Sequence, residues 1–496
     1  MSSFAPSLQP SNRAAPRPVP IPQLRPGTII AITLIACVGV GALMAHDPKL
    51  GIGVLVGLCY LPLALVNLPL GIALWVPTTF LTGLPGISTA SQAAGLVIAL
   101  AWLGTLRSHA HDQGKHVPRG LLVLVAVFIV WLSLSMVWAE DPEMSFRALQ
   151  PWLGCALMFT VLMTLDFTRT QIRTIAFAFI FGVTFSVALG LIGGVTPPSE
   201  TSAVANDGRL RGGLDDPNYL AAGIVPSLAM AVGLAVGVRS ALARLALAGM
   251  GVILVLGLGA TESRGGLIAA IVATAAALVV AKRGRILVIA FVAIMVGLVA
   301  IWFAASPDAY KRVTQTADQG NGRSSLWIVG GRIFKDHPIA GVGLENYQVY
   351  APRYVSGPGV LTFVNFIAER PHVVHNVYLQ ILVEVGLIGL GLFLAIILSS
   401  LAAALRAARK FESRGDGESS AFSRSVFVAL LAALVASFFI SNGNGFQIWV
   451  LLAFGPMLMR LAQREEDSAP APMLAGVPEP RDVPALSARR EPAVLA

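Results

Sequence analysis

Long apolar segments separated by short polar ones dominate the chain from residue 28 to residue 462. A helix that crosses the hydrocarbon core of a bilayer needs about 20 mostly apolar residues, with roughly 17 as the lower limit. Segments near or above that length are residues 28–45, 50–66, 70–84, 90–106, 120–138, 151–165, 172–194, 218–238, 242–260, 264–281, 285–304, 377–403, 421–440 and 446–462. The 70–84 segment is short, contains Pro77 and is followed by Pro85, so we expect a half-helix there. The pattern predicts an all-α polytopic membrane protein of about 12 to 14 transmembrane helices.

The two ends of the chain lack this pattern. Residues 1–26 and 463–496 are rich in Pro, Ala, Ser and charged residues, and such segments bury too little apolar surface to fold. We therefore expect two disordered tails around a transmembrane domain at residues 27–462. The first apolar segment has no small-residue cleavage site directly behind it, which indicates a retained helix and not a cleaved signal peptide.

Lys and Arg residues predict the orientation of the helices, because cytoplasmic loops carry an excess of them. With the N-terminus inside, the inward loops 107–119, 166–173, 239–244, 282–285 and 405–424 hold fifteen basic residues. The short outward connections hold five, which are Lys49, Arg147, Arg209, Arg211 and Arg264. Both termini are then expected in the cytoplasm, and the long 305–375 segment is expected on the outer side.

The composition agrees with a chain that is mostly dissolved in lipid, since 55% of its residues are hydrophobic and 12% are charged. A formal net charge of +9 could indicate nucleic-acid binding in a soluble protein. Here the basic residues are scattered among short loops between spans, which indicates membrane topology and no nucleic-acid partner. The three cysteines, Cys37, Cys59 and Cys155, lie inside apolar segments, where a thiol packs as a small hydrophobic group.

The 305–375 segment is too long for a plain connection, because structureless loops beyond about 12 to 15 residues are usually functional or disordered. Its many aromatic residues give it material to pack. Residues 323–335 have the spacing of an amphipathic helix, with Trp327 and Arg332 on different sides. The sequence Asp336-His337-Pro338 ends that helix, because proline disfavours helical geometry in the residue before it. We expect one or two short helices at the outer surface.

Five motifs follow one another in the second half of the chain: DPNYLA at 216–221, SRGG at 263–266, GRSSLW at 322–327, HPIAGVGLENY at 337–347 and HNVYLQILVEVGLIGL at 375–390. Their order and spacing resemble the O-antigen ligase and O-antigen polymerase superfamily. The resemblance covers residues 200–400 strongly and the N-terminal helices only through general hydropathy. Glu345 departs from the family pattern, which has a small residue at this position of the GVG turn.

The resemblance implies a glycosyltransferase of the bacterial cytoplasmic (inner) membrane that serves polysaccharide biosynthesis in the cell envelope. Such an enzyme moves a glycan from undecaprenyl pyrophosphate to an acceptor hydroxyl on the outer side of that membrane. The superfamily contains ligases that use a lipid-core acceptor, repeat-unit polymerases and protein O-oligosaccharyltransferases, and the sequence does not separate them. A transporter of lipid-linked glycans is a further alternative. It would place its charges at the bilayer midplane, whereas here they lie in loops and at outer helix ends.

Two arginines are candidates for holding the diphosphate, because a guanidinium group can bind two phosphate oxygens at once. Arg264 stands at the outer end of the 264–281 segment, and Gly265-Gly266 would let a bulky head group approach the backbone. An arginine that extends to the interface, or one that pairs with Glu262, remains an alternative. Arg323 stands at the start of the surface helix, where backbone N–H groups favour anions. Its alternative is a solvated loop arginine.

Further polar residues surround these candidates in the sequence. Arg209 and Arg211 precede the 218–238 segment and add positive charge on the outer side, where they are candidates for substrate binding. Asn218 is a substrate-binding candidate as well, although Asp216 and Asn218 are also residue types that cap helices.

Transfer to a hydroxyl also needs a base, and histidine titrates near neutral pH. His372 and His375 stand at the beginning of the 377–403 segment. We choose His375 as the base and Asn376 as its orienting or sugar-binding neighbour, because both belong to the HNVYL motif of the resemblance. The alternative is a histidine that makes a local hydrogen bond at a helix N-terminus.

Metal and cofactor chemistry find little support. The pair Asp215-Asp216 resembles acidic metal motifs, but no soluble nucleotide-binding domain surrounds it. Walker, HExxH and GxSxG motifs are absent from the sequence. If arginines neutralise the diphosphate, no metal ion and no cofactor is needed.

Overall fold

A computed structural model of the chain describes residues 45–108, 116–193, 208–282, 285–305, 323–356 and 373–468, together with a few isolated residues between these ranges. The predicted tail 1–26 and most of the predicted tail 463–496 lie outside the described residues. The chain divides into two compact units, Met1–Pro62 and Leu63–Ala496. The first unit contains most of helix α2, and the second contains all the helices that follow it.

The described residues form fifteen α-helices and three short 3-10 helices, without a β-strand. The α-helices are α2 (Pro48–Val66), α3 (Leu68–Trp75), α4 (Ile87–Ser108), α5 (Arg119–Leu134), α6 (Pro142–Thr164), α7 (Arg169–Leu191), α8 (Pro217–Gly237), α9 (Ala241–Ala260), α10 (Arg264–Val280), α11 (Arg285–Ala305), α13 (Arg323–Asp336), α14 (Tyr347–Tyr350), α16 (Val377–Ser413), α17 (Gly417–Ala436) and α18 (Phe446–Asp467). The 3-10 helices are η1 (Val76–Phe80), η2 (Ser135–Val137) and η3 (Ala351–Tyr354). In this part of the chain, ten helices are long and apolar enough to cross a membrane, and three shorter apolar helices accompany them. The prediction of an all-α polytopic membrane protein is confirmed.

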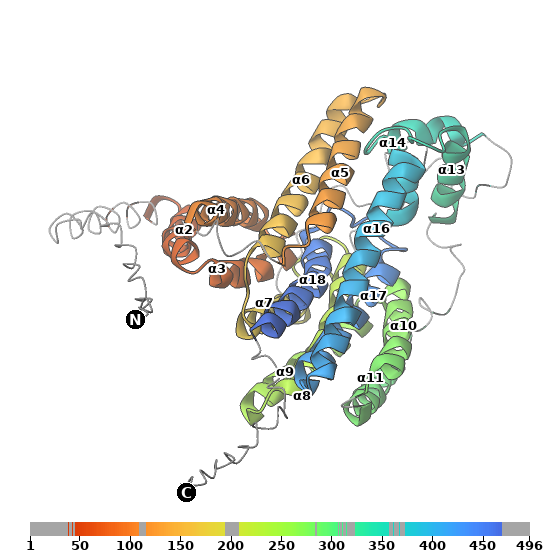
Figure 1. Cartoon of the computed structure of the whole chain (residues 1–496). Coiled ribbons are helices and arrows are strands. Elements are labelled where there is room, and N and C mark those ends of the chain that lie inside the picture. The colour runs from red at the N-terminus through yellow and green to blue at the C-terminus, as the bar shows by residue number, and fades with distance from the viewer. Residues whose placement is uncertain are drawn as a thin grey trace, which may run out of the picture. The chain divides into compact units, whose positions relative to one another are not determined.

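Helices α8, α17 and α18 form the centre of the bundle and are the most buried of the long helices. Helix α16 packs against α17, α18 and α5 (Figure 1). The contact of α16 with α18 is close because of Gly455, since a Cβ atom there would lie only 2.3 Å from the carbonyl oxygen of Ser400. Helix α11 is the least buried of the long helices, because only 6% of its apolar part is buried.

The helix boundaries differ from the hydropathy pattern where a helix is amphipathic. Helix α6 begins at Pro142, nine residues before the predicted 151, and the Asp141 carboxylate caps it by accepting a hydrogen bond from the Met144 N–H at 2.9 Å. The first turns of α6 are polar, so the hydropathy pattern does not include them in the predicted transmembrane segment. The 70–84 segment forms the short helices α3 and η1. Helix α13 ends at Asp336, directly before His337-Pro338, as predicted.

Helix α16 is broken at Gly386, which has φ 70° and ψ −171°. Residues 338–343, which we call the docked loop, fill the break. The Val342 N–H donates to the Val383 carbonyl at 3.0 Å, the Gly343 N–H donates to the Glu384 carbonyl at 2.7 Å, and the Leu387 N–H donates to the Pro338 carbonyl at 3.0 Å. Only glycine fits at the break, because a Cβ atom at position 386 would lie 2.0 Å from the Ile339 carbonyl oxygen. The break ties two motifs, HPIAGVG and HNVYLQILVEVG, into one structural unit.

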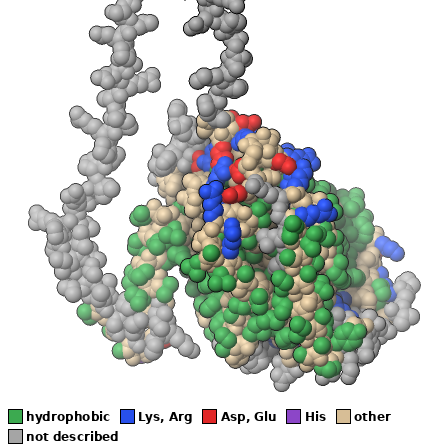
Figure 2. Space-filling view, turned by 90° about the horizontal axis from the view of Figure 1, so that it is seen from below, with side chains coloured by type: hydrophobic (Ala, Val, Ile, Leu, Met, Phe, Trp, Pro, Cys, Tyr) green, Lys and Arg blue, Asp and Glu red, His purple; other side chains and the backbone are tan. Residues whose placement is uncertain are grey.

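The two ends of the bundle differ in charge. We call the end where α6, α8, α10, α16 and α18 begin the cap end, because α13 and α14 lie there beside the start of α16 (Figure 1). At the opposite end, ion pairs join the helix termini: Arg169 with Asp416 and Glu465, Arg173 with Glu418, Lys282 with Glu412, Arg424 with Glu412, Lys410 and Arg414 with Glu466, and Arg460 and Arg464 with Asp166. Figure 2 shows, on the face seen from below in Figure 1, charged side chains of both signs gathered together and hydrophobic side chains over the rest.

Candidate functional site

Three residues in left-handed backbone conformation mark the cap end. Among the residues that the structure describes, Glu262 (φ 48°), Glu345 (φ 59°) and His375 (φ 53°) are the only non-glycine residues with positive φ. Each belongs to, or directly precedes, a motif of the sequence: SRGG, HPIAGVGLENY or HNVYL. Such conformations cost about 1 to 3 kcal/mol each and cluster at functional sites. The backbone therefore points to these three motifs as one site.

Hydrogen bonds fix the backbone that carries Arg264. The Ser263 hydroxyl caps α10 by accepting from the Gly266 N–H at 3.1 Å, and it donates to Asn218 Oδ1 at 2.9 Å. The same Asn218 oxygen accepts from Arg209 Nη2 at 3.1 Å, while Arg209 Nε donates to the Thr261 carbonyl at 2.8 Å. Arg209 and Asn218 thus hold the beginnings of α8 and α10 together. In this structure they position the Arg264 backbone.

Arg323 opens helix α13 and lies close enough to Arg264 for the two charges to interact. Burial lowers the pKa of the Arg323 guanidinium from its ordinary value, the Asp216 carboxylate raises it, and the Arg264 guanidinium lowers it further. The described residues provide no hydrogen bond or ion pair for the Arg323 side chain. Two guanidinium groups therefore share one region of the cap end with the carboxylate of Asp216.

His375 lies directly before α16 and is half-buried. Asn376 is the N-cap, and its Oδ1 atom accepts from the N–H groups of Tyr378 at 3.0 Å and Leu379 at 3.1 Å. The indole N–H of Trp327, one helical turn after Arg323, donates to the carbonyl of Val374 at 3.1 Å. This bond holds the helix that carries Arg323 against the residue that precedes His375.

The connection between α17 and α18, residues 437–445, contacts α8 and the beginnings of α10 and α16. The Val377 N–H donates to the Ser437 carbonyl at 3.0 Å, and the Tyr219 hydroxyl donates to the Ser441 carbonyl at 2.7 Å. The ring of Phe439 packs against Gly265, where a Cβ atom would lie 2.7 Å from it. Sequence reasoning missed this connection. Its signal is the SNGNG sequence at 441–445, a cluster of turn residues between two apolar helices.

The docked loop continues into Asn346, which attaches it to the start of α6. Asn346 is fully buried; its Oδ1 atom accepts from the Asp141 N–H at 2.8 Å, and its Nδ2 atom donates to Ser145 Oγ at 2.8 Å. Nδ2 also contacts the carbonyls of Asp141 at 3.2 Å and Leu344 at 3.0 Å. All polar atoms of its side chain are thus satisfied, so Asn346 holds the cap in place.

Beside Asn346, two carboxyl groups share one amide. Gln380 Nε2 donates to Glu384 Oε1 at 3.1 Å and lies 3.5 Å from Glu345 Oε2. Glu384 is only 3% exposed although it lies in an apolar helix, and burial raises the pKa of the Glu345 carboxyl. An ionisable residue inside a span is usually functional, which is the sequence signal by which Glu384 could have been found.

The predicted site residues therefore fall into two groups. Arg264 and His375 belong to segments that contact the 437–445 connection, and Trp327 holds the helix of Arg323 against the residue that precedes His375. Arg209, Asn218 and Asn376 hold these segments through their own hydrogen bonds. Arg211 lies half-buried in the 208–214 loop, whose Leu214 N–H donates to the Arg211 carbonyl at 3.2 Å. His372 lies outside the described residues.

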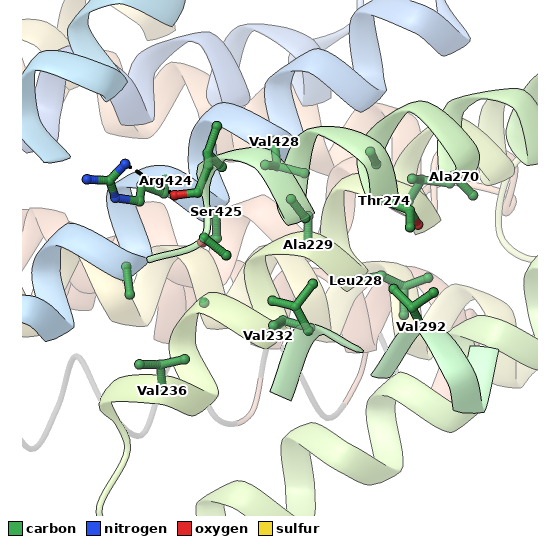
Figure 3. Close-up of a pocket in the computed structure, with 18 of the residues that line it drawn as sticks. Leu228, Ala229, Val232, Val236, Ala270, Thr274, Val292, Arg424, Ser425 and Val428 are labelled. Atoms are coloured by element: carbon green, nitrogen blue, oxygen red, sulfur yellow. Dashed lines mark hydrogen bonds between the residues drawn. The ribbon is translucent and has the colours of Figure 1, made fainter. Parts of the chain in front are cut away.

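An apolar groove of about 80 Å³ lies between α8, α10, α11 and α17, away from these residues (Figure 3). It follows α10 from Ala270 toward its C-terminal end, and Arg424 lies at one end of the groove. Arg424 donates to the Val280 carbonyl at 3.2 Å and to Glu412 Oε2 at 2.6 Å. Its apolar walls fit lipid, and it is not part of the site at the cap end.

No curated protein was found to match the chain. Residues 249–394 match the family model described as O-antigen ligase. The match runs from α9 to the first half of α16, and it contains Arg264, Arg323 and His375 as well as the docked loop. The resemblance predicted from the motifs is confirmed over residues 249–394: this part of a multi-pass membrane protein matches the O-antigen ligase family.

Proposed function

We propose that this O-antigen ligase-type enzyme moves an oligo- or polysaccharide from undecaprenyl pyrophosphate to an acceptor hydroxyl. The observation that carries the proposal is the position of α13, which begins with Arg323 and is held by the Trp327 indole against the carbonyl that precedes His375, with Arg323 close enough to Arg264 for their charges to interact. Two neighbouring guanidinium groups attract anions and can together bind several phosphate oxygens. A diphosphate carries the charge that such a pair binds.

The two arginines act on the leaving group. When the bond between the sugar C1 atom and the phosphate oxygen breaks, its electron pair stays on the diphosphate, and negative charge grows there. Guanidinium groups fixed beforehand stabilise this charge more in the transition state than in the ground state. The diphosphate is then neutralised by Arg264 and Arg323, and the proposed mechanism requires no metal ion or cofactor.

His375 acts on the acceptor. Its imidazole takes the proton of the attacking hydroxyl while the acceptor oxygen forms the new bond to C1 from the side opposite the diphosphate. The imidazolium then returns the proton to the released diphosphate or to water. The left-handed backbone at His375 and the cap at Asn376 hold the imidazole at the mouth of α16. Arg209, Arg211, Asn218 and Asn376 support substrate binding from the surrounding loops.

The lipid tail of the donor has a place beside Arg264. An apolar groove of about 780 Å³ between α9, α10 and α11 begins at Leu267, one helical turn after Arg264. Its walls also include Ile271 and Val296. A diphosphate held by Arg264 would leave its polyprenyl chain over this groove and the surrounding lipid.

The proposal places the cap end on the outer side of a bacterial cytoplasmic membrane, with both termini inside. The excess of Lys and Arg in the 107–119, 166–173, 239–244, 282–285 and 405–424 loops supports this orientation. Cysteine labelling in intact cells tests it: a cysteine at Gln348 would react with a membrane-impermeant maleimide, and one at Arg409 would not.

A direct assay uses the purified protein in lipid nanodiscs with a lipid-linked glycan donor and an acceptor extract. We expect His375→Ala to abolish transfer, and Arg264→Lys to reduce it by at least a hundredfold, because lysine lacks the planar fork. Arg353→Lys is the matched control, since Arg353 is exposed, pairs with Glu140 and lies outside the site. Wild-type turnover by His375→Ala would remove the histidine from the mechanism.

A deletion strain distinguishes the members of the superfamily. Loss of long chains from the lipid core means a ligase, single repeats mean a polymerase, and loss of glycans from Ser or Thr of proteins means a protein O-oligosaccharyltransferase. Lipid-linked glycan retained on the cytoplasmic side would instead favour a transporter.

A further inference from the structure

A cavity with a partly polar wall lies at the cap end, separate from the two apolar grooves described above. It has a volume of about 300 Å³ and lies between η1, α7, α8, α17 and α18. Side chains of Asp215, Asp216, Tyr219, Asn442 and Gln447 contribute its polar wall. Phe179 and Leu451 belong to its apolar part. Because Asp215 is exposed, the cavity is open to solvent at this end of the bundle.

The polar wall keeps hydrogen-bonding capacity that the protein itself does not use. Asn442 Oδ1 accepts from Ser437 Oγ at 3.0 Å, and the Gln447 amide nitrogen donates to the Thr79 carbonyl. Among the described residues, the Asn442 amide nitrogen, Gln447 Oε1 and the Asp215 carboxylate have no hydrogen-bond partner. The cavity thus offers both donors and acceptors, with acceptors in excess.

This combination fits a sugar. Each sugar hydroxyl donates one hydrogen bond and accepts others. A carboxylate accepts from the hydroxyl, and a carboxamide can donate to it through its nitrogen, so the two groups together satisfy it. The apolar wall of Phe179 and Leu451 suits the C–H face of a sugar ring. Ligand sites measure roughly 300 to 1,000 Å³, so this cavity is at the lower limit and would admit the end of a glycan.

The cavity borders the arginine site through one residue. Asp216 lines the cavity and at the same time acts on the charge of Arg323. Its Oδ1 atom caps α8 by accepting from the Asn218 N–H at 2.6 Å. Asn218 Oδ1 in turn accepts from the hydroxyl of Ser263, the residue directly before Arg264, so hydrogen bonds connect the cavity wall to the beginning of α10.

We propose that this cavity is the acceptor subsite and binds the sugar residue whose hydroxyl receives the glycan. The inference rests on the proposed transfer reaction, in which the donor occupies the arginine site. Asp215 and Asn442 bind hydroxyls of the acceptor sugar, and the apolar wall receives its ring. The cavity selects acceptors by their terminal sugar, and it leaves the diphosphate to the arginines.

Saturation-transfer NMR on the protein in nanodiscs tests this, with methyl glycosides of glucose, galactose and rhamnose as probes. We expect at least one of them to bind the wild type. Asp215→Leu and Ala222→Leu should each weaken that binding at least tenfold, because the first removes acceptors and the second fills the cavity from α8. Ala229→Leu is the matched control, since Ala229 belongs to the same helix and lines the groove of Figure 3.

Undecaprenyl pyrophosphate binding is measured on the same samples and should stay within twofold of the wild type in all three variants. The inference is overturned if no glycoside binds the wild type, or if Ala222→Leu binds the glycoside as tightly as the wild type does. It is also overturned if Ala222→Leu impairs undecaprenyl pyrophosphate binding, because the cavity would then serve the donor. Failure of the wild type to bind undecaprenyl pyrophosphate would instead contradict the proposed function.

Discussion

Replacing Gly386 by alanine tests the connection between the docked loop and the broken helix. An alanine Cβ atom would lie 2.0 Å from the oxygen and 2.3 Å from the carbon of the Ile339 carbonyl. Both atoms belong to the backbone, so no side-chain rotation relieves the clash. The variant must move the docked loop away from α16 or straighten the helix, and either change separates the two motifs.

The cost follows from the bonds that are lost. Four backbone hydrogen bonds join the docked loop to α16. Three are 2.7 to 3.0 Å long, and each of these contributes about 1 kcal/mol net; the fourth, from the Ile388 N–H to the Ile339 carbonyl, is 3.5 Å long and weaker. A left-handed alanine adds about 1 to 2 kcal/mol if the break persists. Docking is thus weakened by about 4 kcal/mol, which corresponds to a factor on the order of a thousand.

Hydrogen exchange of the Val342 and Gly343 amides measures this directly, because both donate to α16 in the docked state. We expect their exchange in Gly386→Ala to accelerate on the order of a thousandfold. Gly391→Ala is the matched control: it lies in the same helix, and a Cβ atom there meets nothing within 4 Å. If both amides keep wild-type protection in Gly386→Ala, the docked loop is not held by the break and the reasoning fails.

Other outcomes follow from the cap. Asn346→Ala should lower the free energy of unfolding by about 3 kcal/mol, because it removes four hydrogen bonds from a fully buried side chain. Arg353→Ala, which breaks an exposed ion pair, should leave the melting temperature unchanged, and equal losses in the two variants would contradict the buried role. Burial raises the pKa of Glu345 above 4.5, so the folded protein keeps a proton that the unfolded chain releases, and stability falls as pH rises from 4.5 through the folded pKa. Glu345→Gln should make the melting temperature less dependent on pH over that window, and an unchanged slope would assign the titration elsewhere.

Much of the fold could be predicted from the sequence because hydropathy acts locally. The short 70–84 segment and the end of α13 at Asp336 both follow from nearby prolines. The early start of α6 could not be predicted from hydropathy, since its first turns are polar. They are held by the Asn346 side chain, which accepts from the Asp141 N–H and donates to Ser145 Oγ. The break at Gly386 depends on hydrogen bonds to residues some 45 positions earlier in the chain. A single glycine in an apolar helix does not by itself predict such a break.

The candidate site divides in the same manner. Arg264, Arg323 and His375 could be selected because their motifs resemble a family and their charges suit a diphosphate. The 437–445 connection and the Asp215–Asn442 cavity could not, because their polar groups meet only after helices α8, α17 and α18 pack. Asn218 stays a predicted substrate-binding residue, and the structure adds a positioning role that the sequence does not show, since its Oδ1 atom joins Arg209 and Ser263.

The left-handed residues Glu262, Glu345 and His375 have a consequence for engineering. Glycine adopts their conformation without penalty, so a directed-evolution campaign that selects only heat resistance would favour glycine at these positions. Such thermostable descendants would still insert and fold, and under the proposed mechanism those that had lost the imidazole of His375 would lack the base and would be inactive. Selection for this enzyme therefore has to score turnover together with survival at high temperature.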